Sequence, residues 1–568
     1  MLLILAYWLY LLALTSVFGL LFQKIFKFKE IHPSLTLMLG GFAISIVATL
    51  WTLFGGLNSV FDICLIIACC VVAFFLRKDL RFFLMNLKDK LRSLSPFLKI
   101  IFTMLTLFVA AKSAGIPFIL DNESYYIQTI KWLDNFGLVK GLANLHPFLA
   151  QTSGWHVLQS SLNLNNWFLN LNDLNGFYLC IANFYALSHL NEYKRSKDLS
   201  LLFIGSFFIF NVFLFQFVDA PSPDLAIYIC TFFIFSEFLK ESIYPSEANK
   251  KHLLLFSIAV FASFIKVTAV LLLLFPLILI IRDRTFSRND SIKLSFLGIM
   301  ILLLFVVRNY IISGYPLYPL QIFGSEGTMW KLPGELYHFI THQTKLYGFF
   351  MSEEQFAASS SFQRFIHWLM LPGLHGFFNK MMVLFLALFP IVIWKTEYKK
   401  TYTILFVFCA LQLGLFWLGS PQYRFFFGAL MLLIMATFIT FFKKQIYFNS
   451  LLIVGLFLVA IPLIYPLPLN ALTKNKFQNA LVPLSLEHLV IPAESTRYTD
   501  TRYVKIIEGN LRFHTPVNVD FFWASGDGPL PCVQAVQIDY FKENYKLLPQ
   551  QIGAEISEGF YSLHLTNE

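Results

Sequence analysis

Two carboxylates, Asp121 and Glu123, stand one residue apart directly after an apolar run that ends at Leu120. If that run spans a membrane, the pair lies at the bilayer boundary, where a carboxylate is costly unless it is solvated, paired or functional. One of them can act as a general base toward an acceptor hydroxyl or as a ligand of a divalent cation, Mg²⁺ or Mn²⁺; partial burial raises a carboxyl pKa, which suits a base. Helix capping is the alternative role.

Three cations occupy comparable positions. Lys266 separates two apolar runs, Arg308 ends one, and Arg424 begins another. Together they suit the phosphate of a lipid-linked donor, which Arg binds by paired hydrogen bonds and Lys as a point charge. For each cation taken alone, snorkelling toward lipid headgroups is the simpler explanation.

Four further side chains complete the candidate set. Asp219 and Asp224 flank a short turn between apolar runs, and His146 and His156 lie in the polar segment after Glu123. These residues could bind an acceptor sugar or a metal ion, whereas Asp224 could simply cap a helix and the histidines could be solvated loop residues.

The composition identifies the elements that must position these residues. The chain has 568 residues, of which 57% are hydrophobic and 13% charged, whereas soluble domains carry about 25% charged residues. We therefore expect an all-α polytopic membrane protein. Its net charge of +10 lies mostly in short loops, which indicates membrane topology rather than nucleic-acid binding.

The hydropathy pattern predicts about fourteen spans (12–14), each of about 20 residues. Lys266 divides the least certain stretch, which is either two short helices or one long tilted helix. The predicted spans are 2–22, 34–55, 58–76, 97–119, 174–190, 199–217, 224–239, 252–265, 267–281, 292–307, 381–394, 401–418, 424–442 and 450–468. The first has no preceding basic residue, which predicts an uncleaved span with an external N-terminus.

Positive charge alternates along the chain. The loops rich in Lys and Arg are 23–33, 77–96, 191–198, 240–251, 282–293, 395–400 and 443–449. The fourteen-span arrangement puts all of these loops on one side of the membrane, which is then the cytoplasmic side. We expect the membrane to be a bacterial inner membrane. The external side then carries the loops 120–173 and 308–380, the turn at Asp219, and the tail, which is residues 469–568.

We expect residues 1–468 to form the transmembrane domain and residues 469–568 a small external α+β or irregular domain. Ser124 to Asn135 has helical spacing and predicts an amphipathic helix on the membrane surface, capped by Asp121 or Asn122 and ended by Gly137. In the tail, Gly509-Asn510 predicts a hairpin between β-prone runs.

Aromatic residues and cysteines are expected to be structural. The five loop tryptophans are most simply membrane-interface residues: Trp132, Trp155, Trp167, Trp330 and Trp368. Six cysteines lie in apolar runs and are expected in the core, and Cys532 has no second cysteine in the tail, so a disulfide framework is excluded.

The acidic pair at the start of the first large external loop resembles the GT-C superfamily of polytopic glycosyltransferases, which includes dolichyl-phosphate-mannose-type protein mannosyltransferases. Lys266-Val267-Thr268-Ala269 looks like a short Lys-containing segment of some members. The chain also resembles a group of uncharacterised bacterial membrane proteins, in its Asp121-to-Tyr126 stretch, its Arg308-Asn309-Tyr310 and Gly314-to-Pro319 stretches, and Pro529-Leu530-Pro531-Cys532.

This resemblance, over residues 1–470, implies inverting transfer of a sugar from a polyprenyl-phosphate donor to an external glycan, lipid or protein, with Asp121 or Glu123 as base. Many GT-C relatives have Asp-Glu or Asp-x-Asp where this chain has Asp-x-Glu. The uncharacterised group implies a second tail cysteine near Trp523, and this chain has none there.

Two other functions stay open. A cell-envelope polysaccharide polymerase or ligase usually has a large, Arg/His-rich external loop late in the chain. The loop 308–380 gives that function some support, but the acidic first loop favours the transferase. A transporter or flippase is expected to show charges within spans and inverted repeats, and neither is visible in this sequence.

Overall fold

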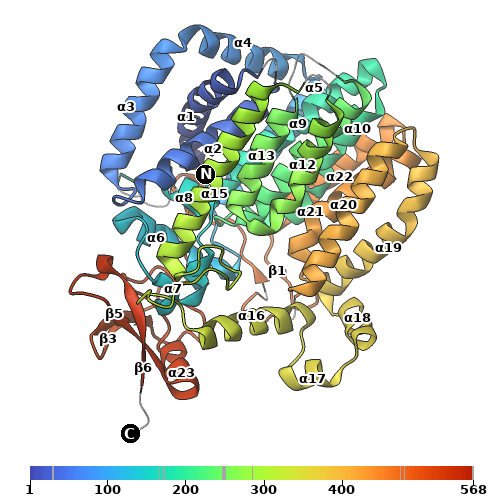
Figure 1. Cartoon of the computed structure of the whole chain (residues 1–568). Helices are drawn as coiled ribbons and strands as arrows, with labels where there is room; N and C mark the ends of the chain where they lie inside the picture. The colour runs from blue at the N-terminus through green and yellow to red at the C-terminus, as the bar shows by residue number, and fades with distance from the viewer. Residues whose placement is uncertain are drawn as a thin grey trace.

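The computed structural model describes residues 1–28, 31–164, 167–168, 171, 173–245, 251–283, 286–473, 475–478 and 480–565. Parts of the predicted basic loops 23–33, 240–251 and 282–293 lie outside the described residues. The chain is mainly helical, and the long helices form a bundle with small antiparallel sheets at one end (Figure 1).

Nine helices of the described chain are long and apolar enough to cross a membrane. They are α1 (Leu2–Phe26), α2 (Pro33–Trp51), α5 (Pro96–Ser113), the broken helix Leu199–Phe217 with α10 (Leu199–Gly205) and α11 (Asn211–Leu214), α15 (Arg288–Ser313), α19 (Gly373–Lys395), α20 (Lys399–Leu418), α21 (Tyr423–Phe441) and α22 (Gln445–Ile464). The number rises to ten if α3 (Ser59–Phe75) and α4 (Arg77–Ser93), which meet at 91°, form one span.

Besides α3, which does not meet those criteria alone, four of the fourteen predicted spans are helical without meeting them. They are α9 (Asn175–Ser196), α12 (Pro223–Ile243), α13 (Lys251–Ile265) and the segment Val267–Arg282 that includes α14 (Leu274–Arg282). Two of them carry polar side chains that pair inside the bundle: Tyr185 of α9 donates to Glu237 of α12 at 2.5 Å. Interior pairing makes such residues tolerable at membrane depth.

The stretch around Lys266 is two helices rather than one. The backbone of Lys266 is extended, with φ −151° and ψ 120°, and a 3₁₀ turn from Val267 to Leu273 follows it. The alternative of two short helices meeting at Lys266 is therefore confirmed.

The predicted basic loops meet at one end of the bundle. Contacts between their segments join Lys24 to Asp79 (3.5 Å), Lys194 to Ser95 (2.9 Å), Tyr193 to the carbonyl of Lys443 (2.9 Å) and Lys293 to the carbonyl of Phe26 (3.2 Å). Loop 77–96 is not irregular, because most of it forms α4. This convergence agrees with the charge pattern, whose assignment to the cytoplasm stays a prediction.

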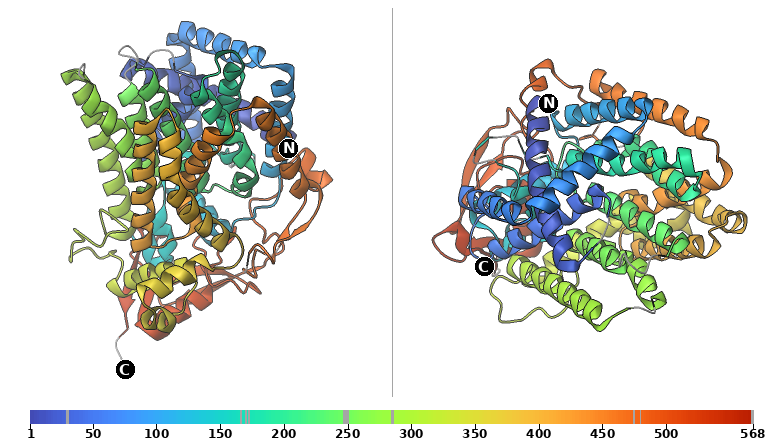
Figure 2. Two further views of the ribbon diagram at one scale, coloured as in Figure 1. Left: turned by 90° about the vertical axis from the view of Figure 1, so that its right-hand side faces the viewer. Right: turned by 90° about the horizontal axis from the view of Figure 1, so that it is seen from above.

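The opposite end carries the remaining short elements (Figures 1 and 2). They are α6 (Ile127–Phe136), α7 (Leu142–Leu145), α8 (Gly154–Ser160), α16 (Gly334–Phe349), α17 (Glu353–Ala358), α18 (Ser361–Leu369), α23 (Ala535–Tyr545), β1 (Leu467–Pro468), β2 (Ala480–Leu481), β3 (Tyr503–Glu508), β4 (Leu511–Pro516), β5 (Leu547–Gln551) and β6 (Phe560–His564). The strands pair as β1–β2, β3–β4 and β5–β6, all antiparallel. The predicted hairpin at Gly509-Asn510 is confirmed by the β3–β4 pair, with Gly509 at φ +62°.

The predicted surface helix is instead enclosed. In α6 the supposedly solvated Gln128 is 1% exposed and donates to the carbonyls of Gly526 and Gly528, and Asp134 accepts from Ser160 and Asn163. The tail thus covers Gln128, and residues of the same loop cover Asp134, while Asn135 on the same face is exposed. The C-terminal end is as predicted, with Gly137 at φ +75°.

Several predicted environments are wrong. Trp132, Trp155 and Trp368 are fully buried rather than interfacial, while Trp167 is 59% exposed. Cys64 and Cys70 are exposed on α3 rather than in the core. All seven cysteines are free.

Candidate functional site

The acidic stretch folds as a π-helical turn, Asn122–Tyr126, immediately before α6. The N–H of Ile127 bonds to the carbonyl of Asn122, five residues back, so the turn is wider than an α-helical one. Such turns occur preferentially at functional sites. Asp121 makes no capping hydrogen bond, and the amide of Asn122 donates to Glu123 and to the carbonyl of Ser495. The predicted capping role is therefore not what these side chains do.

Glu123 is fully enclosed by the tail. Its carboxylate accepts from the hydroxyl of Thr496 at 2.6 Å and from the backbone N–H of Arg497 at 3.0 Å, besides Asn122. Burial raises the pKa of Glu123, and those hydrogen bonds oppose the shift. Its backbone carbonyl accepts from the N–H groups of Ser525 and Gly526 at 2.9 and 2.8 Å. With 0% exposure, this carboxylate anchors the tail rather than meeting a substrate.

Asp121 is the accessible carboxylate. Its Oδ2 lies 2.6 Å from Nη1 of Arg424, with 27% of the Asp121 side chain and 29% of the Arg424 side chain exposed. The hydroxyl of Tyr126 lies 3.4 Å from the same oxygen, and Nε of Arg424 donates to Gln422 at 3.0 Å. The sequence could not choose between Asp121 and Glu123, whereas their surroundings separate them.

A second ion pair lies beside the first. Nζ of Lys266 is 2.5 Å from Oδ1 of Asp224. It also lies 4.3 Å from the ring centre of Phe425, and Cζ of Arg424 lies 5.2 Å from the same ring. Both cations thus lie near the Phe425 ring, and the π face of an aromatic ring attracts positive charge.

Arg308 is buried without a carboxylate partner. It is 2% exposed, and its Nε and Nη1 have no hydrogen-bond partner among the described residues. Its guanidinium lies over the rings of Phe264 and Phe305, at 4.7 and 5.5 Å. A buried cation without an acceptor is costly, so this site favours an anion.

His156 connects Arg308 to the Asp121 pair. Its Nδ1 accepts from the N–H of Ser153, closing a capping box at the start of α8, and its Nε2 has no partner among the described residues. Burial, with Arg308 and Lys266 nearby, lowers the pKa of His156 to about 3. The imidazole is therefore neutral, and its ring centre lies 4.9 Å from that of Tyr126.

Two predicted site residues lie elsewhere. Asp219 forms a buried ion pair with Lys112; burial raises the pKa of Asp219 and Lys112 opposes that shift. His146 accepts from the N–H of Phe148 and packs against Trp523, and burial lowers its pKa to about 4. Asp219 and His146 thus have partners of their own, Lys112 and Trp523, away from the two ion pairs. His156, in contrast, packs on Tyr126 and lies near Arg308 and Lys266.

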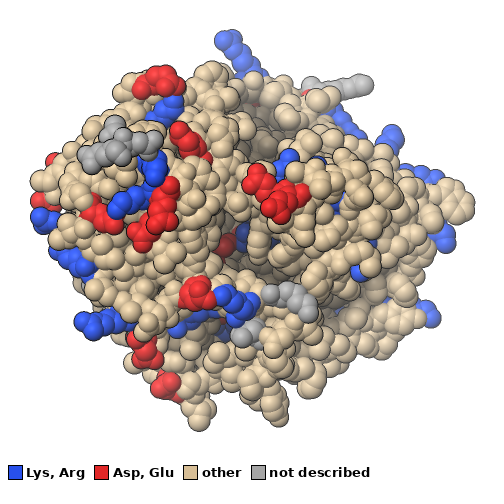
Figure 3. All heavy atoms as spheres, turned by 90° about the horizontal axis from the view of Figure 1, so that it is seen from below, with Lys and Arg blue, Asp and Glu red and all other residues tan. Residues whose placement is uncertain are grey.

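The face that carries the C-terminal strands is hollowed near its middle, and acidic and basic atoms are visible inside the hollow (Figure 3). Across the described part of the chain, no three His, Cys, Asp or Glu side chains are grouped closely enough to hold a metal ion together. Two ion pairs of the site, Asp121–Arg424 and Asp224–Lys266, hold its charged side chains, apart from Arg308.

Sequence reasoning missed the residues that complete this arrangement. Phe425 directly follows Arg424, and Tyr126 lies three residues after Glu123. An aromatic residue close in sequence to a candidate charged residue was the pattern that could have identified both. Thr496 and Arg497, which hold Glu123 and the segment before it, lie more than 370 residues from it. No local pattern connects them with the acidic stretch.

A family model described as "Domain of unknown function (DUF8201)" matches residues 1–431. This is more than half of the 568 residues, so the chain belongs to that family. The match includes all the predicted site residues and ends within α21, before the tail that encloses Glu123. No curated protein and no solved structure matches the chain.

Proposed function

We propose that this member of the DUF8201 family is a GT-C-like membrane glycosyltransferase with about fourteen spans. It moves a sugar from a polyprenyl-phosphate donor to a hydroxyl of an external acceptor. The observation that carries the proposal is the partly exposed Asp121–Arg424 pair, with Lys266 and Arg308 close to it. A carboxylate for a hydroxyl proton and cations for a phosphate are the two functions that this transfer requires.

The proposed step is a single displacement. The acceptor oxygen attacks the anomeric carbon, the bond from that carbon to the phosphate oxygen breaks, and polyprenyl phosphate leaves with the bond electrons. The hydroxyl proton passes to Asp121. Because attack and departure occur on opposite faces of the sugar, the anomeric configuration inverts.

Arg424 has two roles in this proposal. In the free protein it is bonded to Asp121, which occupies the lone pairs that would accept the hydroxyl proton. A donor phosphate competes for the guanidinium, because Arg binds phosphate through the same N–H groups. Donor binding thus frees Asp121 as the acceptor of a proton only when the sugar is in place.

Arg308 and His156 supply the inner part of the phosphate site. Arg308 has unpartnered N–H groups at Nε and Nη1, and the neutral His156 offers Nε2. If the Nε2 position carries the imidazole proton, it donates to a phosphate oxygen as well, consistent with Nδ1 accepting from Ser153. Lys266 has a partner in Asp224 and adds charge at the outer edge.

The proposed location is a bacterial inner membrane, with the N-terminus, the acidic turn and the C-terminal strands external. Its support is the basic loops gathered at the opposite end of the bundle. The amino group of Met1 also donates to the carbonyl of His488 at 2.6 Å, which puts the N-terminus on the tail.

The donor assignment is tested by the thermal stability of the purified full chain with added polyprenyl phosphate. We expect the lipid to raise the Tm of the wild type and to lose most of that effect in Arg424→Gln and Lys266→Gln. Lys131→Gln is the matched control, because Lys131 is a cation that pairs with Asp527 outside the cluster. No stabilisation of the wild type, or equal stabilisation of all variants, would overturn the assignment.

A further inference from the structure

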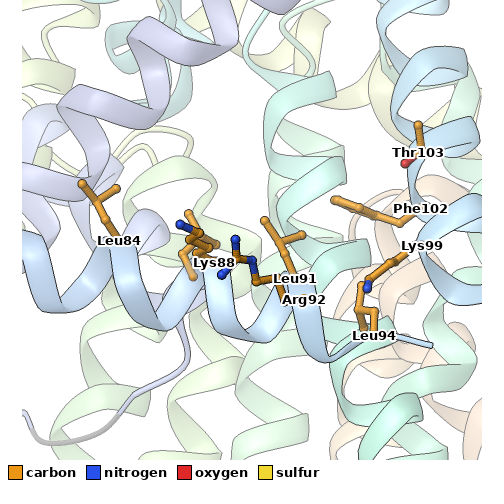
Figure 4. A pocket seen from close by; sticks show the side chains of 9 residues that line it. Leu84, Lys88, Leu91, Arg92, Leu94, Lys99, Phe102 and Thr103 are labelled. Carbon is orange, nitrogen blue, oxygen red and sulfur yellow. The ribbon is translucent and has the colours of Figure 1, made fainter. Parts of the chain in front are cut away.

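A second candidate binding region lies between α4 and α5, at the end of the bundle that carries the basic loops. A cavity of about 410 Å³ lies there. Its lining combines apolar side chains with three cations, Lys88, Arg92 and Lys99. In Figure 4 the side chains of α4 and those of α5 face one another across this angle.

Helix α4 is amphipathic and lies across the bundle rather than along it. It turns 91° from α3 at Leu76, so that it runs perpendicular to a membrane-spanning direction. It carries six cations, Arg77, Lys78, Arg81, Lys88, Lys90 and Arg92, against two carboxylates, Asp79 and Asp89. Phe82 and Met85 are 70% and 53% exposed on the same helix. Basic charge with exposed apolar side chains is the pattern of a helix lying in the membrane interface.

The three lining cations are available to a ligand. No hydrogen bond or ion pair joins the side chain of Lys88, Arg92 or Lys99 to another described residue, whereas the side chain of Lys90 on the same helix pairs with Glu192. The lining contains no carboxylate. Leu84, Leu87, Leu91 and Phe102 supply an apolar wall beside the cations.

From this arrangement we propose that the α4–α5 cavity binds one anionic phospholipid of the membrane leaflet at this end of the bundle. The headgroup phosphate contacts Lys88, Arg92 and Lys99, and the upper acyl chain lies along Leu91 and Phe102. The charge pattern selects this occupant, because unpaired cations beside an apolar wall complement a phosphate attached to a hydrocarbon chain. This site is independent of the transferase proposal, since it lies at the other end of the molecule.

Native mass spectrometry of the purified full chain tests the site directly. Vesicle-derived phosphatidylglycerol and phosphatidylcholine are offered in equal amounts, and the lipid retained after mild activation is counted. We expect one retained phosphatidylglycerol per chain in the wild type and preference of at least fivefold over phosphatidylcholine. Equal retention of both lipids would overturn the proposal without requiring any variant.

Matched triple variants distinguish lipid binding in the cavity from general electrostatic attraction of the lipid to the basic surface. Lys88→Gln, Arg92→Gln and Lys99→Gln together should abolish the preference for phosphatidylglycerol. Lys78→Gln, Lys399→Gln and Lys400→Gln together remove the same charge from exposed positions of the basic segments that do not line this cavity, and should retain the preference. An equal loss in both variants would mean diffuse attraction, and competition by millimolar glycerol phosphate alone would mean a free-anion site; either result contradicts the proposal.

Discussion

Arg424 and Asp121 form an ion pair of 2.6 Å although 303 residues separate them in the sequence. The pair joins the start of α21 to the turn before α6, and neither side chain is fully buried. It therefore depends on the bundle bringing two distant helix ends together. A partly exposed pair of this kind contributes little stability on its own, so its position suggests a role in binding or chemistry.

The two carboxylates of the acidic stretch should respond differently to amide substitution. Asp121→Asn should reduce sugar transfer by at least 100-fold with an unchanged Tm, because the proton acceptor is lost from an exposed position. Glu123→Gln should lower the Tm and retain transfer in the folded fraction. Both are measured in membranes with polyprenyl-phosphate-linked sugars and by thermal unfolding of purified protein. Full transfer in Asp121→Asn would exclude it as the base.

Arg308 should destabilise the ligand-free protein. A buried cation without a hydrogen-bond partner costs free energy in the folded state, so Arg308→Met, which removes that charge, should keep or raise the Tm without lipid. The same variant should lose stabilisation by polyprenyl phosphate. Differential scanning fluorimetry with and without the lipid checks both. A Tm that falls without lipid would show that Arg308 has a structural role.

Thr496 should contribute to stability through Glu123. Thr496→Val removes a hydroxyl donor from a buried carboxylate, which costs roughly 1–3 kcal/mol. Thr496→Ser keeps the hydroxyl and serves as the control. Chemical unfolding of the two variants should separate them, with the valine variant less stable. If both match the wild type, the tail does not depend on this hydrogen bond.

Cys532 should be unreactive in the native protein. Burial raises its pKa to about 12, and the thiolate is the reactive form, so maleimide labelling should stay slow from pH 7 to pH 9. Unfolding should expose the thiol and make labelling fast. The measurement uses a chain in which the other six cysteines are alanine. Rapid native labelling would indicate that the segment around Ser525 opens readily.

The parts of this fold that sequence could predict are those set by local pattern. Apolar runs predicted where the long helices lie, and Gly509-Asn510 predicted a hairpin. At Lys266 the sequence offered a helix break as one of two alternatives, and the structure has the break. The burial of Gln128 in α6 could not be predicted, because the polar residues of this helix have the same spacing as those of a solvent-exposed face. The partner of Gln128, Gly526, lies 398 residues away in the sequence.

The candidate site shows the same division. The residue types of Asp121, Lys266, Arg308 and Arg424 were informative as a set, because a carboxylate and several cations at span ends suit a phosphate and a hydroxyl, although each cation alone has a simpler explanation. Which of these residues pair with one another could not be predicted, because the pairing depends on which helix ends lie side by side. Asp219 flanks the same turn as Asp224, but it forms an ion pair with Lys112 of α5.

The anchoring of Glu123 by the tail has a consequence for the order of biosynthesis. Thr496 follows Glu123 by 373 residues, and at about 5–20 residues per second the ribosome needs roughly 20–75 seconds to cover that gap. During this interval the helices between them emerge while the acidic turn still lacks its cover. The segment around Thr496 thus covers Glu123 only after the helices between them have been made, and a nascent chain stopped before that segment would carry an uncovered carboxylate at Glu123.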